Sequence, residues 1–322
     1  MNPQHTPESI RGTLLRPRTA AGPGTRARPA GRTLREWLTF AAFVAPNLCF
    51  LAAFSYWPLL QNVYLSFVEW DMISPEKLWI GLENWHVVLS DRRFRQILGN
   101  TLGFTGGSVG LTLVLGLALA LLLNQRLVLR NGARAILFTP TILPGAAIAV
   151  VWVYMFDPNF GLIKAVLAGA GVPGPRWLTD PAWAMPAVIL VYVWKNAGYS
   201  VVVLLAGLQG IPRDLYEAAR VDGAGAWQRF RHVTIPGLGP IALFLVITSV
   251  LGSFQAFDII RVMTAGGPVI ATTTLIYQLY IEGFTAFHAG RAGVYAVILF
   301  AIMLTLTVVQ LRVVERRVTY NA

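Results

Sequence analysis

Charged residues are scarce in this sequence. Asp, Glu, Lys and Arg make up 13% of its 322 residues, whereas soluble domains carry roughly 25%. So little charge cannot cover the surface of a soluble domain, and we therefore expect an integral membrane protein. Cysteine is scarcer still, because Cys49 is the only one and lies within a long apolar run. A single cysteine excludes a disulfide within the chain, and a lone thiol in such a run most often packs as a small hydrophobic side chain.

The residue patterns of common catalytic and cofactor sites are also missing. No phosphate-binding loop of the form G-x-x-x-x-G-K-[ST] occurs, so the chain is not expected to bind ATP in that manner. The histidines lack the spacing of metal ligands, and Ser200 lacks the second glycine of a nucleophile elbow. We therefore expect no enzyme, no metal site and no cofactor. The lysines and histidines are Lys77, Lys164, Lys195, His5, His86, His232 and His288.

Carboxylates are absent from the interiors of the long apolar runs. Every Asp and Glu lies in a connecting segment or a tail, except Asp258 at the outer end of the fifth run. Ion-coupled carriers usually place Asp or Glu within their spans as ion or proton sites. The absence favours an ATP-driven transporter over an ion-coupled secondary carrier. The carrier stays open as an alternative, as does a membrane scaffold without transport of its own.

Six apolar runs are long enough to cross a bilayer, which takes about 20 residues. They predict an all-α, polytopic membrane protein with six transmembrane helices. The first 36 residues are rich in Arg and Pro and lack the apolar centre of a signal peptide, so we expect a disordered basic tail that touches anionic lipid. The chain thus divides into a tail, 1–36, and a membrane domain, 37–322. The runs lie near residues 38–60, 97–123, 135–156, 183–207, 238–257 and 292–311.

Lys and Arg are distributed unevenly over the segments that connect the runs. The tail, the segments 124–134 and 208–237 and the C-terminus together hold roughly twice as many as the segments of the other side. This bias predicts that both termini and the segment 208–237 lie in the cytoplasm. The cations form no stripe with interleaved aromatic residues, so the net charge of +11 does not indicate a nucleic-acid partner.

Small residues recur in the second apolar run. Gly99, Gly103 and Gly107 occupy every fourth position. This spacing lets helix backbones approach each other closely, so that dispersion contacts stabilise a bundle in lipid. The three glycines are therefore predicted to pack helices.

Three basic residues are candidates for a substrate path. Lys195 is the one charge deep within a run, and its insertion costs about 2.5–3.5 kcal/mol. We expect it to face the bundle interior or a wet cavity. There it either attracts an anionic substrate or donates hydrogen bonds to the carbonyls of a neighbouring helix. Arg261 and Arg291 are expected at the outer mouth of the path.

A polar, helix-forming segment lies between the fourth and fifth runs. Pro212 suits a first helical turn, and Arg213 and Glu217 are spaced to pair across one turn. Gly223 then breaks the helix, and Pro236 ends the second helical stretch. The pattern predicts a short helix-turn-helix on the membrane surface, with a shape that docks into another protein.

The order of residues in this segment resembles the EAA loop of ABC-importer permeases. It reads Glu-Ala-Ala, three residues, Gly, nine residues, then Val-x-Ile-Pro. In that family the loop is the coupling helix, which inserts into a groove of the ATPase subunit. The resemblance implies that the segment 209–236 docks on a separate ATPase. The matching residues are Glu217, Ala218, Ala219, Asp222, Gly223 and Pro236.

From about residue 36 the chain resembles the permeases of carbohydrate-type ABC importers, and near its end the A-type permeases of glycerol-3-phosphate importers. Its motifs include Ala45-Pro46, Asn100-Thr101, Gly266-Gly267-Pro268-Val269 and Val318-Thr319-Tyr320. The resemblance implies the six-helix fold of type I importers in a bacterial inner membrane. It also implies a second permease as partner, an ATPase dimer and an extracytoplasmic binding protein. The implied cargo is sn-glycerol 3-phosphate or a related glycerophosphodiester, with a neutral di- or oligosaccharide as the alternative.

Overall fold

Helices dominate the structure. The computed structural model describes residues 30–125 and 129–315, and most of these residues are helical. Within these ranges the strands are β1 (Val68–Glu69) and β2 (Leu78–Trp79), which pair antiparallel. The all-α prediction is confirmed. Most of the predicted basic tail and the motif Val318-Thr319-Tyr320 lie outside the described residues.

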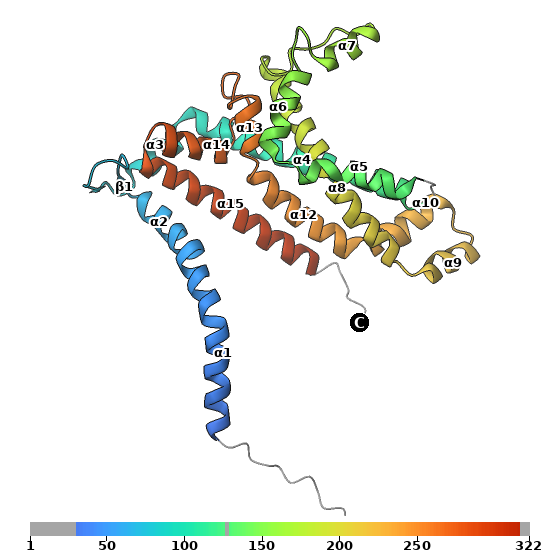
Figure 1. Ribbon diagram of the computed structural model, residues 1–322, viewed down its shortest axis with the longest axis horizontal. Coiled ribbons are helices and arrows are strands. Elements are labelled where there is room, and N and C mark those ends of the chain that lie inside the picture. Colours follow the sequence, from blue (N-terminus) through green and yellow to red (C-terminus); the bar gives the residue numbers. More distant parts are fainter. Residues whose placement is uncertain (1–29, 126–128, 316–322) are drawn as a thin grey trace, which may run out of the picture. The chain divides into compact units, whose positions relative to one another are not determined.

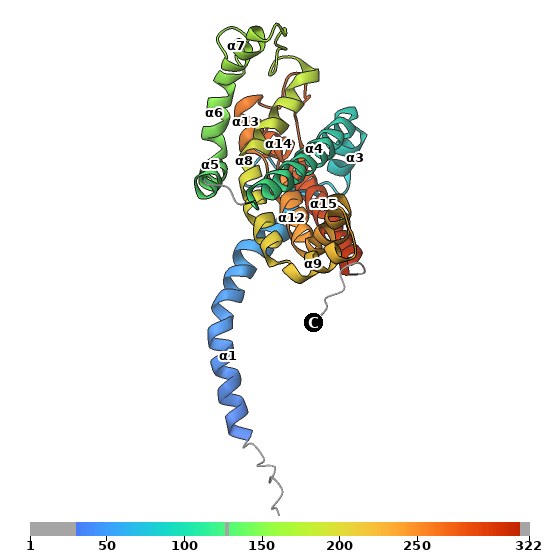
Figure 2. The same cartoon turned by 90° about the vertical axis from the view of Figure 1, so that its right-hand side faces the viewer.

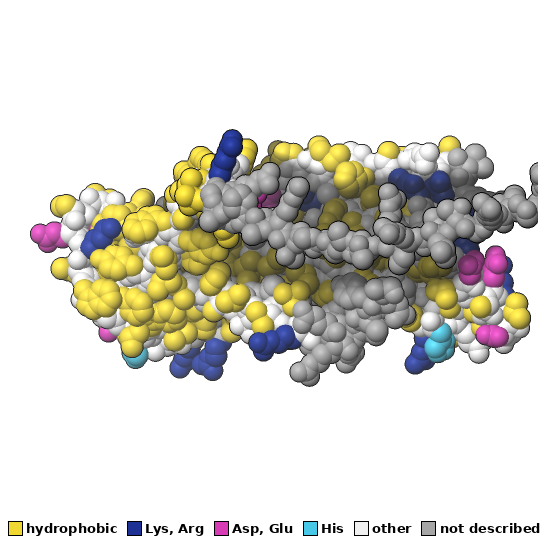
Figure 3. All heavy atoms as spheres, turned by 90° about the horizontal axis from the view of Figure 1, so that it is seen from below, with side chains coloured by type: hydrophobic (Ala, Val, Ile, Leu, Met, Phe, Trp, Pro, Cys, Tyr) yellow, Lys and Arg dark blue, Asp and Glu magenta, His cyan; other side chains and the backbone are white. Residues whose placement is uncertain are grey.

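Several described helices are long and apolar enough to cross a membrane. Four satisfy this alone, and up to six spans result if each of two bent helix pairs counts as one. The predicted six spans are reached when each bent pair is counted as one span. Hydrophobic side chains cover much of the face shown in Figure 3, as expected for a surface that meets lipid. The four unbroken spans are Leu34–Leu65, Arg92–Leu123, Pro181–Gly210 and Ala289–Arg312.

The chain divides into two compact units, Met1–Trp57 and Pro58–Ala322. The described part of the first unit is α1 (Ala30–Leu51), which continues into the π-helical turn η1 (Ala52–Tyr56). The helix α1 begins within the segment 1–36, so helical structure starts before the predicted boundary of the tail.

The third apolar run is not a straight span. It forms α5 (Arg130–Ile142) and α6 (Gly145–Met155), which meet at 102°. Leu143 between them is extended, because the ring of a following proline disfavours helical geometry. Pro144 also has no N–H with which to continue the helical ladder. The span predicted over 135–156 is therefore bent, and Pro144 is the physical reason for the bend.

The helices α4 (Arg92–Leu123) and α8 (Pro181–Gly210) pack along each other at the centre of the second unit (Figure 1). Asp91 and Asp180 cap their N-termini, and each carboxylate accepts a backbone N–H bond of 2.9 Å. The long apolar helices are thus started by short polar residues.

Close approach between helices uses mostly other glycines than those predicted. A Cβ at Gly99 or Gly103 would meet nothing within 4 Å among the described residues, so the packing predicted for these two glycines stays a prediction. Gly107 does face another helix, because its Cβ would lie 2.9 Å from Ile189 of α8. Farther along α4, a Cβ at Gly116 would lie 2.7 Å from a side chain of α8. Contact between α4 and α8 therefore depends on Gly107 and Gly116.

The two ends of the second unit carry different elements. The helix α9 (Arg213–Val221) lies at one end, whereas α13 (Asp258–Met263) and α14 (Leu275–Tyr280) lie at the other (Figures 1 and 2). The remaining elements are α2 (Trp57–Leu65), α3 (Glu83–Ser90), α7 (Leu162–Gly169), α10 (Ala226–Arg229), η2 (Phe230–Thr234), α11 (Ile235–Gly237), α12 (Gly239–Phe254), η3 (Ile281–Thr285) and α15 (Ala289–Glu315).

Candidate functional site

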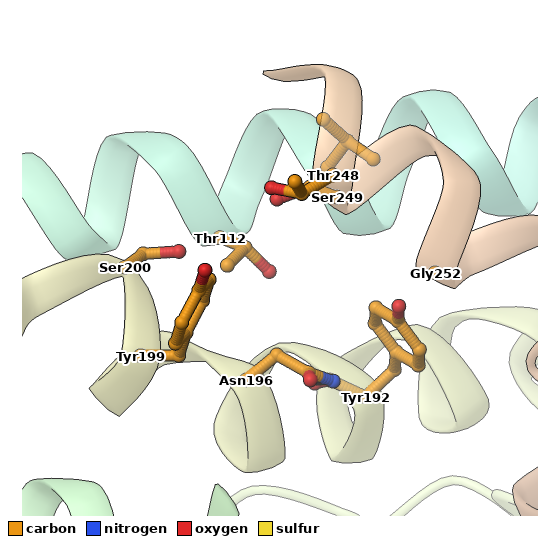
Figure 4. Close-up of a pocket in the computed structure, with 9 residues that line it drawn as sticks. Thr112, Tyr192, Asn196, Tyr199, Ser200, Thr248, Ser249 and Gly252 are labelled. Carbon is orange, nitrogen blue, oxygen red and sulfur yellow. Dashed lines mark hydrogen bonds between the residues drawn. The ribbon is translucent and has the colours of Figure 1, made fainter. Parts of the chain in front are cut away.

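A cavity of about 140 Å³ lies between α4, α8 and α12 (Figure 4). Its lining is uncharged and rich in hydroxyl groups. Three of the lining residues, Tyr192, Asn196 and Tyr199, come from one face of α8, at positions i, i+4 and i+7. The full lining is Val109, Thr112, Tyr192, Asn196, Tyr199, Ser200, Thr248, Ser249 and Gly252.

Two hydroxyl groups of this lining have no protein partner. Thr112 Oγ1 and Ser200 Oγ are buried and form no hydrogen bond within the described part of the chain. A buried polar group without a partner costs about 1–3 kcal/mol. Other lining groups are satisfied, since Asn196 Nδ2 donates to the Tyr192 carbonyl at 2.8 Å. The two hydroxyls therefore lie beside the cavity without a hydrogen-bond partner among the described residues.

Lys195 follows Trp194 on α8, but it does not line this cavity. Its Nζ lies 3.4 Å from the carbonyl oxygen of Thr141, near the C-terminus of α5. In return the Thr141 hydroxyl donates to the Lys195 carbonyl at 3.0 Å. A cation near a helix C-terminus is stabilised by the exposed carbonyl dipoles. Of the two roles kept open for Lys195, the geometry matches the bond to a neighbouring helix.

Arg261 and Arg291 also lie outside the lining of the cavity. The guanidinium of Arg261 on α13 lies over the ring of Tyr280, 4.5 Å from its centroid. Arg291 on α15 lines a second cavity of about 290 Å³, together with Glu69, Asp71 and other residues. The three predicted path residues therefore contact separate elements and do not form one site.

Asp71 at the second cavity has a firmly bound carboxylate. The backbone N–H of Ser74 donates to Oδ1 at 2.7 Å and that of Ile73 at 3.0 Å. The Ser74 hydroxyl donates to Oδ2 at 2.8 Å. These bonds, the Ser74 N–H first, hold the pKa of Asp71 below its ordinary value. The carboxylate is therefore ionised at neutral pH.

The predicted docking segment is exposed. Glu217, Ala218, Asp222, Gly223 and Pro236 are all exposed, and Ala219 is half-buried. No residue of α9 is buried. Apolar side chains also reach the surface here, because Val221 is 87% exposed and Trp227 is 69% exposed. This surface belongs to a short helix that carries little of the hydrophobic core.

The end of α9 is shaped by Gly223, which has φ +76°. The N–H of Ala224 donates to the Ala219 carbonyl at 2.8 Å, and that of Gly223 donates to the Arg220 carbonyl at 3.0 Å. This is the Schellman pattern of helix termination, in which glycine tolerates the left-handed conformation. The predicted helix break at Gly223 is confirmed.

Hydrogen bonds fold the docking segment back on itself. The Tyr216 hydroxyl lies 3.0 Å from Thr234 Oγ1 of η2, and Arg229 Nη1 donates to the Ala224 carbonyl at 3.0 Å. The predicted pair of Arg213 and Glu217 is not among the ion pairs of the described residues. Both side chains are exposed, so water competes for each charge.

The residues of the hydroxyl-lined cavity were missed by sequence reasoning. Polar residues at helical spacing within an apolar run, here Tyr192, Asn196 and Tyr199, were the available signal. The charge of Lys195 on the same helix was the more conspicuous feature. Thr112 and Thr248 come from other runs and carry no sequence signal of their own.

The sequence matches the family model of the binding-protein-dependent transport system inner membrane component over residues 112–320. It is 36% identical over 289 residues to the sn-glycerol-3-phosphate transport system permease protein UgpA of Yersinia pestis, covering 89% of this chain and 97% of that protein. It is also 36% identical over 273 residues to the trehalose/maltose transport system permease protein MalF of Thermococcus litoralis, covering 84% of this chain and 91% of that protein.

The fold is similar to that of a solved bacterial ABC transporter involved in the import of the acidic polysaccharide alginate. The TM-score is 0.77 at 23% identity, and the match covers 90% of this chain and 99% of that chain. The names of these three relatives each give a different cargo.

Proposed function

This chain belongs to the family of inner-membrane components of binding-protein-dependent transport systems, and from that premise we propose that it carries sn-glycerol 3-phosphate or a related glycerophosphodiester. The chain is a multi-pass ABC-importer permease subunit and not an enzyme, since ATP hydrolysis is done by a separate subunit. It forms half of the translocation path of an importer.

One observation carries the choice of cargo, namely the 36% identity to the Yersinia glycerol-3-phosphate permease over 89% of this chain. The matching motifs near the outer end of the fifth run, such as Gly266-Gly267-Pro268-Val269, support it. Arg261 and Arg291 are proposed to draw the anion toward the outer mouth, where exposed charges act over roughly a Debye length of 8–10 Å.

A neutral di- or oligosaccharide is the second candidate, and the cavity between α4, α8 and α12 supports it. Its lining has hydroxyl and amide groups but no cation to offset the lost hydration of a phosphate dianion. Thr112 and Ser200 provide unpaired hydroxyls that match those of a sugar. The Thermococcus trehalose/maltose permease has the same identity to this chain as the Yersinia relative.

The segment 209–236 is proposed to dock into the separate ATPase subunit. The exposure of α9 supports this, because none of its residues is fully buried. The apolar side chains of Val221, at its end, and Trp227, on α10, reach a surface that a partner would cover. The excess of Lys and Arg supports a cytoplasmic position for this segment and for both termini.

The proposed assembly has a heterodimer with a second, similar permease, two copies of one ATPase and an extracytoplasmic binding protein. The description of the family, which names dependence on a binding protein, supports the last of these partners. Gly99 and Gly103, at which a Cβ would meet no atom of the described residues, provide a surface for contact with the second permease.

The cargo is tested by purifying the assembled complex through this chain and identifying the ligand in its binding protein by mass spectrometry. We expect a phosphorylated glycerol compound and a co-purifying ATPase. A binding protein loaded with a neutral sugar contradicts the glycerol-phosphate assignment and leaves the permease assignment intact. Purification of the complex without a co-purifying ATPase would contradict the docking of α9.

A further inference from the structure

Asp258, the one carboxylate at the end of an apolar run, lies against a different span of the chain. It is the first residue of α13 and is half-buried, and its Oδ1 accepts the backbone N–H of Ile259 at 2.9 Å. Its Oδ2 occupies the space in which a Cβ of Gly145, the first residue of α6, would lie. Glycine at position 145 therefore leaves room for the carboxylate at the start of α6.

The charge of this carboxylate is opposite to that of the helix end it faces. The first N–H groups of an α-helix have no partner within the helix, and they give this end a partial positive charge. At α6 the preceding residue is Pro144, which forms no side-chain cap bond. Asp258 is thus placed where it offsets the positive end of α6, which the bend between α5 and α6 separates from the preceding helix.

Apolar packing joins the same two helices. Ile148 and Ala149 of α6 belong to one buried cluster with Ile259 and Ile260 of α13. All four side chains are almost fully buried. The helices α6 and α13 therefore form a packed pair, although they are far apart in the sequence.

This packed pair lies at one end of the hydroxyl-lined cavity. Tyr192 belongs both to the buried cluster and to the lining of the cavity. Figure 4 shows Tyr192 and Gly252 at one end of the cavity, with Tyr199 and Ser200 at the other. On α8, Tyr192 lies farther than Tyr199 from Gly210, after which α9 follows. The pair α6–α13 is therefore next to the end of the cavity that points away from α9.

We propose that Asp258 is a positioning residue for transport, whose carboxylate, seated on Gly145, holds α6 against α13 and keeps the cavity closed on the side opposite α9. The proposal rests on the proposed function, because a cytoplasmic α9 makes this the outer side, from which an importer takes its cargo (Figures 1 and 2). An ion-coupled carrier would instead need a carboxylate that faces the cavity, and Asp258 is not part of the lining.

Ser249→Cys in a Cys49→Ala background reports access to the cavity, because Ser249 is part of its lining. The assembled complex, without binding protein, is labelled in sealed vesicles with an impermeant thiol reagent, separately from each side of the membrane. Asp258→Asn keeps the shape of the side chain but removes its charge. We expect labelling from the side opposite α9 to become at least fivefold faster, while labelling from the α9 side stays unchanged. Glu76→Gln, at an exposed carboxylate, is the matched control and should alter neither rate.

Gly145→Ala tests the same contact from α6. Alanine favours a helix more than glycine does, so the change would strengthen α6 if the carboxylate had no role there. We expect instead the same faster labelling as in Asp258→Asn, and no further increase when both changes are combined. Gly132→Ala on α5, where a Cβ meets no atom of the described residues within 4 Å, is the control and should leave both rates unchanged.

Three results overturn the positioning role of Asp258: unchanged labelling in either variant, equal increases from both sides of the membrane, or additive increases in the double variant. Equal increases would show a general loss of structure, and additive increases would show that the two residues act separately. A parent complex whose ATP hydrolysis the binding protein does not stimulate refutes the proposed function, whatever the labelling rates.

Discussion

At the scale of single residues, the polar groups of α8 divide between two faces. Tyr192, Asn196 and Tyr199 line the cavity, whereas Lys195 contacts the end of α5. Sequence reasoning identified Lys195, because one charge in an apolar run is conspicuous. It could not identify the cavity, because a cavity is made by helices from three separate runs, and their register against one another is set by contacts such as that of Gly116 with Ser200.

Lys195→Met tests whether the lysine is structural. The change removes a 3.4 Å contact to Thr141 and leaves the lining of the cavity intact. A partly exposed charged hydrogen bond of this length contributes about 1 kcal/mol, so we expect the melting temperature of the complex to fall by about 2–4 °C. Uptake of the cargo should stay within twofold of the parent, as measured in reconstituted vesicles. The exposed Lys164→Met is the matched control for loss of charge.

An order-of-magnitude loss of uptake in Lys195→Met, with an unchanged melting temperature, would contradict the structural role. The ammonium group of Lys195 would then contact the substrate in the translocation path and offset the negative charge of its phosphate.

At the scale of elements, the sequence predicts the short polar helix well, but it does not predict how sharply the third span bends. Local residues determine α9, since Pro212 precedes it and Gly223 ends it within one chain segment. The bend between α5 and α6 also has a local cause in Pro144, but many membrane helices continue through a proline when neighbours satisfy the freed carbonyls. The sequence therefore shows where a break is permitted, and the packing around it determines the 102° angle.

The docking of α9 is tested with Glu217→Ala and Gly223→Val. Glu217→Ala removes an exposed carboxylate. We propose that this carboxylate pairs with a basic residue of the ATPase, so its loss should abolish most substrate-stimulated ATP hydrolysis. The second places a β-branched side chain at φ +76°, which distorts the Schellman turn and should weaken ATPase association. Pull-down of the ATPase and its stimulated activity are the measurements.

Ala226→Ser, at an exposed position of α10, is a control that should leave both values unchanged. The side of the membrane is checked by Gln228→Cys in a Cys49→Ala background, which should react with an impermeant thiol reagent only after permeabilisation. Normal transport by both Glu217→Ala and Gly223→Val, or labelling of intact cells, would show that α9 does not dock on a cytoplasmic ATPase.

At the scale of the whole molecule, composition is enough to predict a polytopic helical protein. The charge bias adds a prediction of the side on which each connection lies, which the thiol labelling tests. The hydrophobic runs predict spans because a lipid environment requires every backbone group to be paired within a helix. The cargo is harder to predict, because the binding protein is a separate chain and this chain contributes a neutral cavity with charged residues placed elsewhere.

ATP-driven uptake of labelled sn-glycerol 3-phosphate into vesicles that contain the whole complex is the decisive test of the importer and its cargo. We predict that the labelled compound accumulates only with ATP on the α9 side and the loaded binding protein on the other side. Excess unlabelled maltose should not reduce this accumulation. Uptake driven by a proton or sodium gradient without ATP would contradict the importer. ATP-dependent uptake of maltose alone would contradict the cargo.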